Sequence, residues 1–286
     1  MSSPIEIPEL LSSIISWEKE IAKDVPYLET PTGYFLSFNP KVNGGYRCSP
    51  CDSIVFADTG CDGVHFALLT DFGLNKDLSQ APVICVSPMD FGNFVRVVAD
   101  NLFDFFSLSL MGHDSFLFND FQSKASYEQF LKERETKEYS EYFDHVKWEK
   151  QKEIVKERAF KQFNLKQIDS PYDYVKQLRD KRAESIVIST EDHLGIIPLQ
   201  SREKAVYQAH PWVNQKLDFH RWDEDWDKLV AFVHDAEIET LLSFVRDCQC
   251  HYVDNARVIR LLFDRLEELG FRFEAERLLY CMLQQW

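Results

Sequence analysis

The densest group of residues able to bind a metal lies between Cys48 and His65. Cys48 and Cys51 are separated by two residues, and Cys61 and His65 by three. Thiolates and imidazoles are the usual ligands of structural zinc, and Cys-x2-Cys is a common first half of such a site. The second half is weaker, because Cys61 is predicted in a turn and His65 in the strand after it. We therefore favour packed cysteines without a bound metal, with a zinc-stabilised module as the alternative.

Carboxylates gather around the same turn. Asp58, Asp62 and Asp71 could bind a cation or transfer protons, so a metal-dependent hydrolase built on Asp58, Asp62 and His65 is a further alternative. Aspartates next to glycines are, however, ordinary turn residues. The sequence also lacks the motifs of P-loop enzymes, dinucleotide-binding enzymes, serine hydrolases and zinc proteases. We expect no catalytic residue, no cofactor and no enzymatic activity.

Turn chemistry and β-prone runs define the centre of the chain. Residues 54–57 and 64–69 are β-prone runs on either side of the turn 58–63, whose glycines can take positive φ. A third run follows at residues 83–86. Three strands within about 35 residues, joined by short turns, predict an antiparallel meander. Apolar residues on both sides of 64–69 predict burial on both faces of the sheet.

Helical periodicity accounts for most of the remaining chain. Residues 8–21 predict an amphipathic helix, and residues 94–110 predict a helix buried on more than one side. Short β-prone runs lie at residues 34–38 and 184–189. The other predicted helices cover residues 125–143, 146–163, 170–181, 222–233, 236–247, 255–269 and 273–285.

The charge changes along the chain. Residues 1–121 contain six Lys and Arg against 16 Asp and Glu, whereas residues 122–286 contain 26 against 31. The first portion is therefore acidic, and the second is highly charged but nearly balanced. This shift predicts a boundary near residue 121, between an α+β domain with a mainly antiparallel or mixed sheet and a charged, mainly helical C-terminal region.

Composition excludes several classes of protein. The net charge of −15 argues against a nucleic-acid-binding protein, which needs clustered Lys and Arg. Seven cysteines, an odd number in uneven positions, suit a reducing compartment better than a disulfide framework. No apolar run reaches the roughly 18 residues of a membrane span, and the first residues lack a basic signal-peptide region. We expect a cytoplasmic protein that does not bind membranes.

One stretch carries a family resemblance. Residues 53–110 contain the strand run IVFADTG, the turn and strand CDGVHFALLTDFG, the strand PVICVSPMD and the run NFVRVVADNLFDFFSLS. This stretch, about a fifth of the chain, resembles the SUKH superfamily, the Smi/Knr group and its bacterial relatives. The matching positions are Phe56, Ala57, Gly60, Asp62 and Gly63 in the hairpin and Ala99, Asp100, Leu102, Phe105 and Phe106 in the helix.

The resemblance implies a binding scaffold and not an enzyme. Many bacterial members of the superfamily act as immunity proteins that neutralise a toxin domain, often a nuclease. The acidic first portion agrees with this function independently. Toxins that bind nucleic acid are basic, and opposite charges speed the association of two proteins. We expect a basic protein partner to bind the rim of the hairpin and its acidic neighbours Asp58, Asp62, Asp71 and Asp90.

Overall fold

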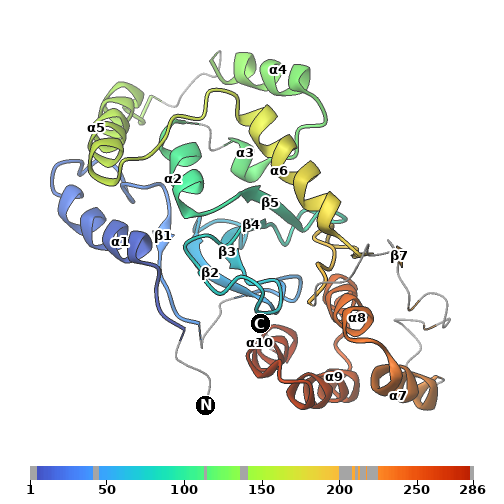
Figure 1. The fold of residues 1–286 in the computed structure, drawn as a ribbon. Coiled ribbons are helices and arrows are strands. Elements are labelled where there is room, and N and C mark those ends of the chain that lie inside the picture. Colours follow the sequence, from blue (N-terminus) through green and yellow to red (C-terminus); the bar gives the residue numbers. More distant parts are fainter. Residues whose placement is uncertain are drawn as a thin grey trace.

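The computed structural model describes residues 5–40, 45–112, 115–135, 141–199, 208–209, 212, 217 and 225–283. A five-stranded antiparallel sheet of order β1-β2-β3-β4-β5 lies at its centre, with helices around it (Figure 1). The predicted α+β class and the meander of short strands are therefore confirmed. The strands are β1 (Phe35–Leu36), β2 (Ser53–Asp58), β3 (His65–Leu69), β4 (Val83–Val86) and β5 (Val95–Ala99).

The register of the strands decides which turns lie together. His65 pairs with Asp58 on one side and with Val86 on the other, and Val86 pairs in turn with Val95. The β2–β3 turn and the β4–β5 turn therefore share one end of the sheet. We call this end, formed by residues 58–64 and 87–94, the two-turn end. The β3–β4 loop, residues 70–82, lies at the opposite end.

Both faces of the sheet are covered, as the unbroken apolar strands predict. On one face, Phe66 and Leu68 pack with side chains from α1 (Glu9–Ile21), α2 (Leu102–Leu110) and α5 (His145–Phe163). On the other face, the alternate residues Ala67 and Leu69 of β3 pack with Leu178 of α6 (Pro171–Ser185) and with Leu194. Strands β2 to β5 therefore contribute to two separate apolar cores.

The predicted helix at residues 94–110 is wrong in its first half. Val95–Ala99 is the edge strand β5, and α2 begins only at Leu102. Asn101 lies between the strand and the helix. Its side chain caps α2 by accepting a hydrogen bond from the backbone N–H of Asp104 (3.0 Å). A continuous apolar run fits a buried strand as well as a buried helix, so periodicity alone does not separate them.

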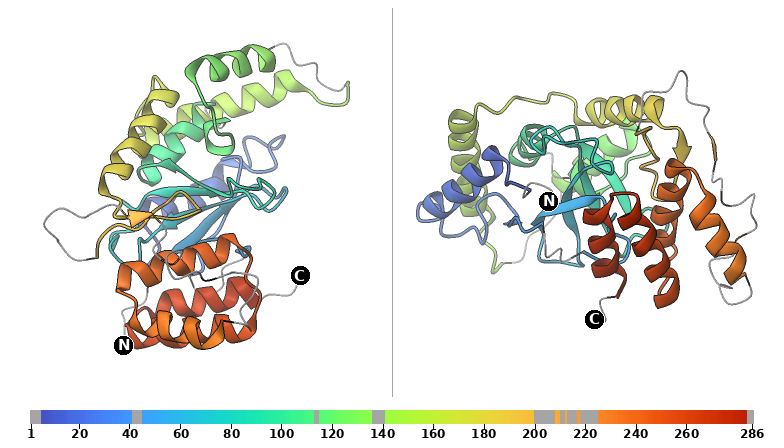
Figure 2. Two further views of the ribbon diagram at one scale, coloured as in Figure 1. Left: turned by 90° about the vertical axis from the view of Figure 1, so that its right-hand side faces the viewer. Right: turned by 60° about the horizontal axis from the view of Figure 1, so that its bottom comes forward.

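A mainly helical C-terminal region follows the sheet, as predicted. Its helices α7–α10 pack together on one side of the sheet, while α1, α2 and α5 lie on the other (Figure 2). The helices beyond α2 are α3 (Ser115–Phe118), α4 (Lys124–Glu135), α5, α6, α7 (Trp226–Asp235), α8 (Ile238–Cys250), α9 (Ala256–Glu268) and α10 (Arg272–Leu283). Between α6 and α7, two short strands, β6 (Ile188–Ser189) and β7 (Gln208–Ala209), pair in parallel.

The expected boundary at residue 121 falls between α3 and α4, and the two portions on either side pack closely. Val155 and Ala159 of α5 belong to the same apolar core as Trp17 of α1. The hydroxyl of Tyr174 donates to the Asp104 carboxylate and accepts from the backbone N–H of Asp100, both at 2.8 Å. Among the described residues, no helix is long and apolar enough to cross a membrane.

The ring of Phe105 lies in the apolar core that Phe66 and Leu68 form with α1, α2 and α5. Its removal tests the fold. The ring lies 4.9 to 5.4 Å from the rings of Tyr34, Phe56 and Phe66. We expect Phe105→Ala to lower the free energy of unfolding by about 3–5 kcal/mol, measured by urea denaturation, because it removes a buried ring and leaves a cavity. Phe103→Ala, on the exposed side of the same helix, is the control and should cost less than about 1 kcal/mol. Equal losses for the two variants would contradict this packing.

Candidate functional site

Two of the predicted partner-binding aspartates lie exposed on the β2–β3 turn. Asp58 ends β2 and accepts a hydrogen bond from the backbone N–H of Gly60 (2.6 Å), and Asp62 follows on the same turn. Gly63 has a φ of 68°, and a Cβ there would lie 2.2 Å from the ring of Tyr46. Only glycine fits this close approach, so the turn presents its carboxylates in one defined conformation.

The neighbouring β4–β5 turn adds exposed apolar side chains that the sequence analysis did not single out. Met89 is 65% exposed and Phe91 77% exposed. Asp90, between them, is half-exposed and pairs with the buried guanidinium of Arg96. The ring of Phe91 packs edge-on against Phe94 at 5.8 Å. The signal in the sequence is two large apolar residues within a Pro/Gly turn, where polar residues are the rule.

These two turns form one surface. Adjacent strands lie about 4.8 Å apart, so the two hairpins, centred two strand spacings from each other, lie about 10 Å apart. The two-turn end therefore combines the carboxylates of Asp58 and Asp62 with the apolar side chains of Met89 and Phe91. Large apolar side chains surrounded by polar ones are characteristic of protein-binding surfaces.

Asp71 does not belong to this surface, although the sequence grouped it there. It follows β3, at the opposite end of the sheet, and its side chain is only 5% exposed. Both oxygens accept hydrogen bonds from Arg182, at 2.6 and 3.0 Å. Burial alone would raise the pKa of Asp71, but the hydrogen bonds and charge of Arg182 outweigh it and hold the pKa below its usual value. Asp71 is a carboxylate of the interior.

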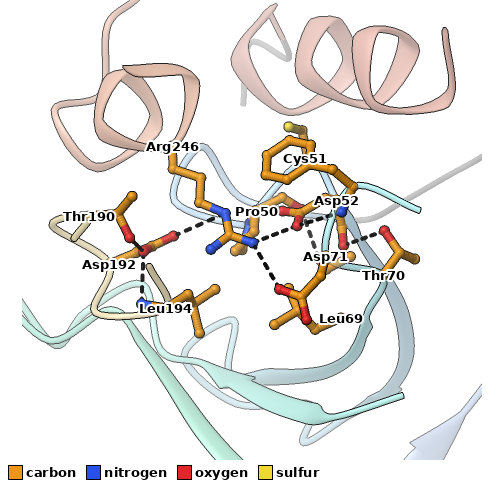
Figure 3. A network of polar contacts seen from close by, with 12 residues as sticks. Pro50, Cys51, Asp52, Leu69, Thr70, Asp71, Thr190, Asp192, Leu194 and Arg246 are labelled. Carbon is orange, nitrogen blue, oxygen red and sulfur yellow. Dashed lines mark hydrogen bonds and ion pairs between the residues drawn. The ribbon is translucent and has the colours of Figure 1, made fainter. Parts of the chain in front are cut away.

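Asp71 is part of a buried ionic network centred on Arg246 of α8 (Figure 3). The Arg246 guanidinium is 1% exposed and donates to the Asp52 carboxylate at 2.5 Å and to the Gly195 carbonyl at 2.7 Å. Asp71 lies 3.6 Å and Asp192 3.9 Å from its nitrogens. Burial opposes the charge of Arg246, but the three aspartates outweigh it and raise its pKa. Burial also raises the pKa of Asp52, against the effect of Arg246.

The cysteines and the histidine of the zinc alternative are not brought together. Cys61 lies exposed on the β2–β3 turn, whereas Cys48 and Cys51 are buried. His65 is buried, with Nδ1 2.8 Å from the Gly63 carbonyl and Nε2 3.0 Å from the Ser49 hydroxyl. The described part of the chain contains no group of three or more His, Cys, Asp or Glu side chains placed to hold a metal.

The histidine of the hydrolase alternative makes its contacts within the protein. A general base needs a free ring nitrogen facing the substrate, but both nitrogens of His65 are occupied within the protein. Burial also lowers the pKa of His65, against the hydrogen bond to the Gly63 carbonyl and the charge of Asp58. The carboxylates of Asp58 and Asp62 are exposed on the turn, whereas His65 is buried. This group is a hairpin turn held by a buried histidine.

A cavity of about 880 Å³ lies at the other end of the sheet, between the N-terminal segment, the β3–β4 loop and α10. Its walls include Ile7, Ile54, Leu78 and Phe273, and Glu274 lines it from the first turn of α10. Glu274 is 5% exposed. Burial, together with the nearby charge of Asp52, raises the pKa of this carboxyl to about 7, against the opposing charge of Arg277.

The comparisons with known proteins identify no relative. No protein-family model matches the chain, and no curated protein matches it. The resemblance to the SUKH superfamily thus depends on the residues of the hairpin and the following helix alone.

Removing the buried cation tests the ionic network. We expect Arg246→Met to lower the free energy of unfolding by about 3–5 kcal/mol, because Asp52 and Asp71 are left buried near each other without it. The double variant Arg246→Met, Asp52→Asn should recover part of this loss in the same urea titration. Arg260→Met removes an exposed pair with Asp264 and should change stability by less than about 1 kcal/mol. A stable Arg246→Met protein would contradict the network.

The raised pKa of Glu274 predicts a pH-dependent effect of its removal. The folded-state pKa of about 7 lies above the usual value of 4.5, so ionisation of Glu274 progressively destabilises the fold as the pH rises from about 4.5 to 7. We expect Glu274→Gln to match the wild type at pH 4 and to exceed it by about 1–3 kcal/mol at pH 8. Thermal unfolding at both pH values measures this, with the half-exposed Glu276→Gln as control. A gain independent of pH would contradict the assignment.

Proposed function

We propose that the chain is a non-catalytic protein-binding module that holds a basic partner at the two-turn end. The observation that carries the proposal is the exposed pair Met89 and Phe91 beside the exposed carboxylates of Asp58 and Asp62. Aromatic and methionine side chains are enriched in interfaces, where they supply much of the affinity. Carboxylates at the rim select a partner of opposite charge.

The resemblance to the SUKH superfamily supplies the class of partner. We infer that the chain acts as a toxin-immunity protein in the cytoplasm, neutralising a basic toxin domain by stoichiometric binding. The net charge of −15 supports this inference, because a basic domain is attracted over a distance of several ångströms before contact. Occlusion of the toxin surface requires no turnover, which agrees with a site made of carboxylates and apolar side chains. The exposed thiol of Cys61 on the same turn donates a hydrogen bond to Asp62 (3.4 Å), and this contact with the carboxylate raises the pKa of the thiol.

The two components of the surface have different roles in the proposed complex. Asp58 and Asp62 raise the association rate, and this effect is weakened by salt. The apolar side chains of Met89 and Phe91 become buried once the partner is bound, so they lower the dissociation rate of the complex. Asp90 contributes less, because its charge is already compensated by Arg96.

Affinity capture from the source cell tests this function. The wild-type chain should recover a basic protein partner at low salt and lose it at high salt. We expect Phe91→Ala to weaken the complex about tenfold or more through faster dissociation. The double variant Asp58→Lys, Asp62→Lys should weaken it through slower association, measured by surface plasmon resonance with the recovered partner.

Two exposed acidic residues outside the surface provide the charge-matched control. Glu20→Lys and Glu128→Lys together change the net charge by the same amount as the aspartate variants, on α1 and α4. They should leave the complex nearly unchanged. Failure to recover any basic partner, or equal weakening by both double variants, would overturn the proposal.

A further inference from the structure

The cavity beside the β3–β4 loop has the dimensions of a small-molecule site. Its volume of about 880 Å³ lies within the range of ligand pockets, which are mostly apolar with a few polar groups that fix orientation. The cavity lies at the end of the sheet opposite the two-turn end, so it is independent of the proposed partner surface. Its walls carry Ile7, Ile54, Leu78 and Phe273.

Glu274 is the distinctive polar group of this cavity. It projects from the first turn of α10, is 95% removed from solvent, and accepts a hydrogen bond from its own backbone amide. Among the described residues, no other donor hydrogen-bonds to this carboxylate and no basic group forms an ion pair with it. A buried carboxylate without a cationic partner is costly unless a bound group supplies one.

Two basic residues belong to this region, and neither pairs with Glu274. Lys76 lines the cavity from the β3–β4 loop, is exposed, and makes no ion pair with Glu274. Arg277, one turn further along α10, is buried and directs its Nε to the Cys51 carbonyl (3.0 Å) and its Nη1 to the Pro40 carbonyl (3.2 Å). It lies near enough to affect the pKa of Glu274 but makes no ion pair with it. The negative charge facing the cavity is therefore not neutralised by α10 itself.

The remaining polar groups of the cavity argue against a metal ion. Asp77 is exposed at its rim, and its Oδ1 accepts hydrogen bonds from the backbone N–H (2.9 Å) and hydroxyl (2.7 Å) of Ser79. Thr70 donates its hydroxyl to the Asp52 carbonyl at 2.9 Å. Hard cations require several oxygen ligands around one point, whereas the carboxylates that line this cavity are the buried Glu274 and the exposed Glu6 and Asp77, and no three of the described acidic, His or Cys side chains are placed to hold a metal. An organic cation fits this combination.

We propose that the cavity binds a small organic amine with an apolar body, whose ammonium group pairs with the Glu274 carboxylate. The apolar body lies against Ile54, Leu78 and Phe273. The ammonium supplies the cationic partner that the fold lacks at this position. A neutral isostere keeps the apolar contacts but leaves the carboxylate unpaired, and a carboxylate ligand adds repulsion.

A series of three isosteric probes tests the charge requirement. The probes are 2-phenylethylamine, 2-phenylethanol and 3-phenylpropionate, titrated into the full chain at pH 8, where Glu274 is mostly ionised and the amine is charged. Isothermal calorimetry should show the amine binding with one-to-one stoichiometry and at least about tenfold more tightly than either other probe. Equal affinity for the three probes, or no binding of the amine, overturns the proposal.

Two further measurements locate the site. Glu274→Gln should weaken 2-phenylethylamine at least about tenfold, while Glu276→Gln, on the exposed side of the same helix, should leave it unchanged. In the wild-type protein, the amine should shift the backbone amide resonances of residues 70–79 and of Phe273, so the result does not depend on the folding of any variant. Shifts confined to other parts of the chain, or an unchanged affinity in Glu274→Gln, overturn the assignment.

Discussion

The fold depends on one buried cation. Arg246 reaches from α8 to the residue before β2, to the loop after β3 and to the loop before Gly195. It pairs there with three aspartates from three separate segments. Each of these carboxylates would be costly in the interior without a partner, and so would the guanidinium. The ionic network therefore makes the helical C-terminal region and the sheet mutually dependent, in a way that apolar packing alone does not.

The Arg246 network stabilises one end of the sheet, and the opposite end carries the exposed groups. The two-turn end takes no part in the Arg246 network, and its turns are held by other contacts, such as those of Tyr46 with Gly63 and His65 and of Phe94 with Tyr252. A surface fixed before a partner arrives loses little conformational entropy on binding. The stability of the molecule and its proposed recognition surface are thus placed at opposite ends of the same strands.

Local sequence predicted the strands of the meander and most helices, but it did not distinguish the aspartates. Asp58 is the last residue of β2 and Asp71 follows β3, each near a glycine, yet Asp58 is exposed and Asp71 is buried. The difference comes from Arg182, which lies 111 residues beyond Asp71 in the chain. Likewise, the apolar run of β5 fits both the helical and the strand periodicity, so periodicity alone predicts a helix there. Contacts between distant segments have no local signature.

The separation of Asp52 and Arg246 along the chain also has a consequence for synthesis on the ribosome. All five strands precede α8, and Asp52 is 194 residues from its cation. The hairpins contain only local contacts and can form early, whereas the ion pair closes a long loop and forms late. Until α8 emerges, the sheet holds Asp52 and Asp71 close together without Arg246. The nascent sheet therefore remains incomplete at that end until nearly the whole chain has been made.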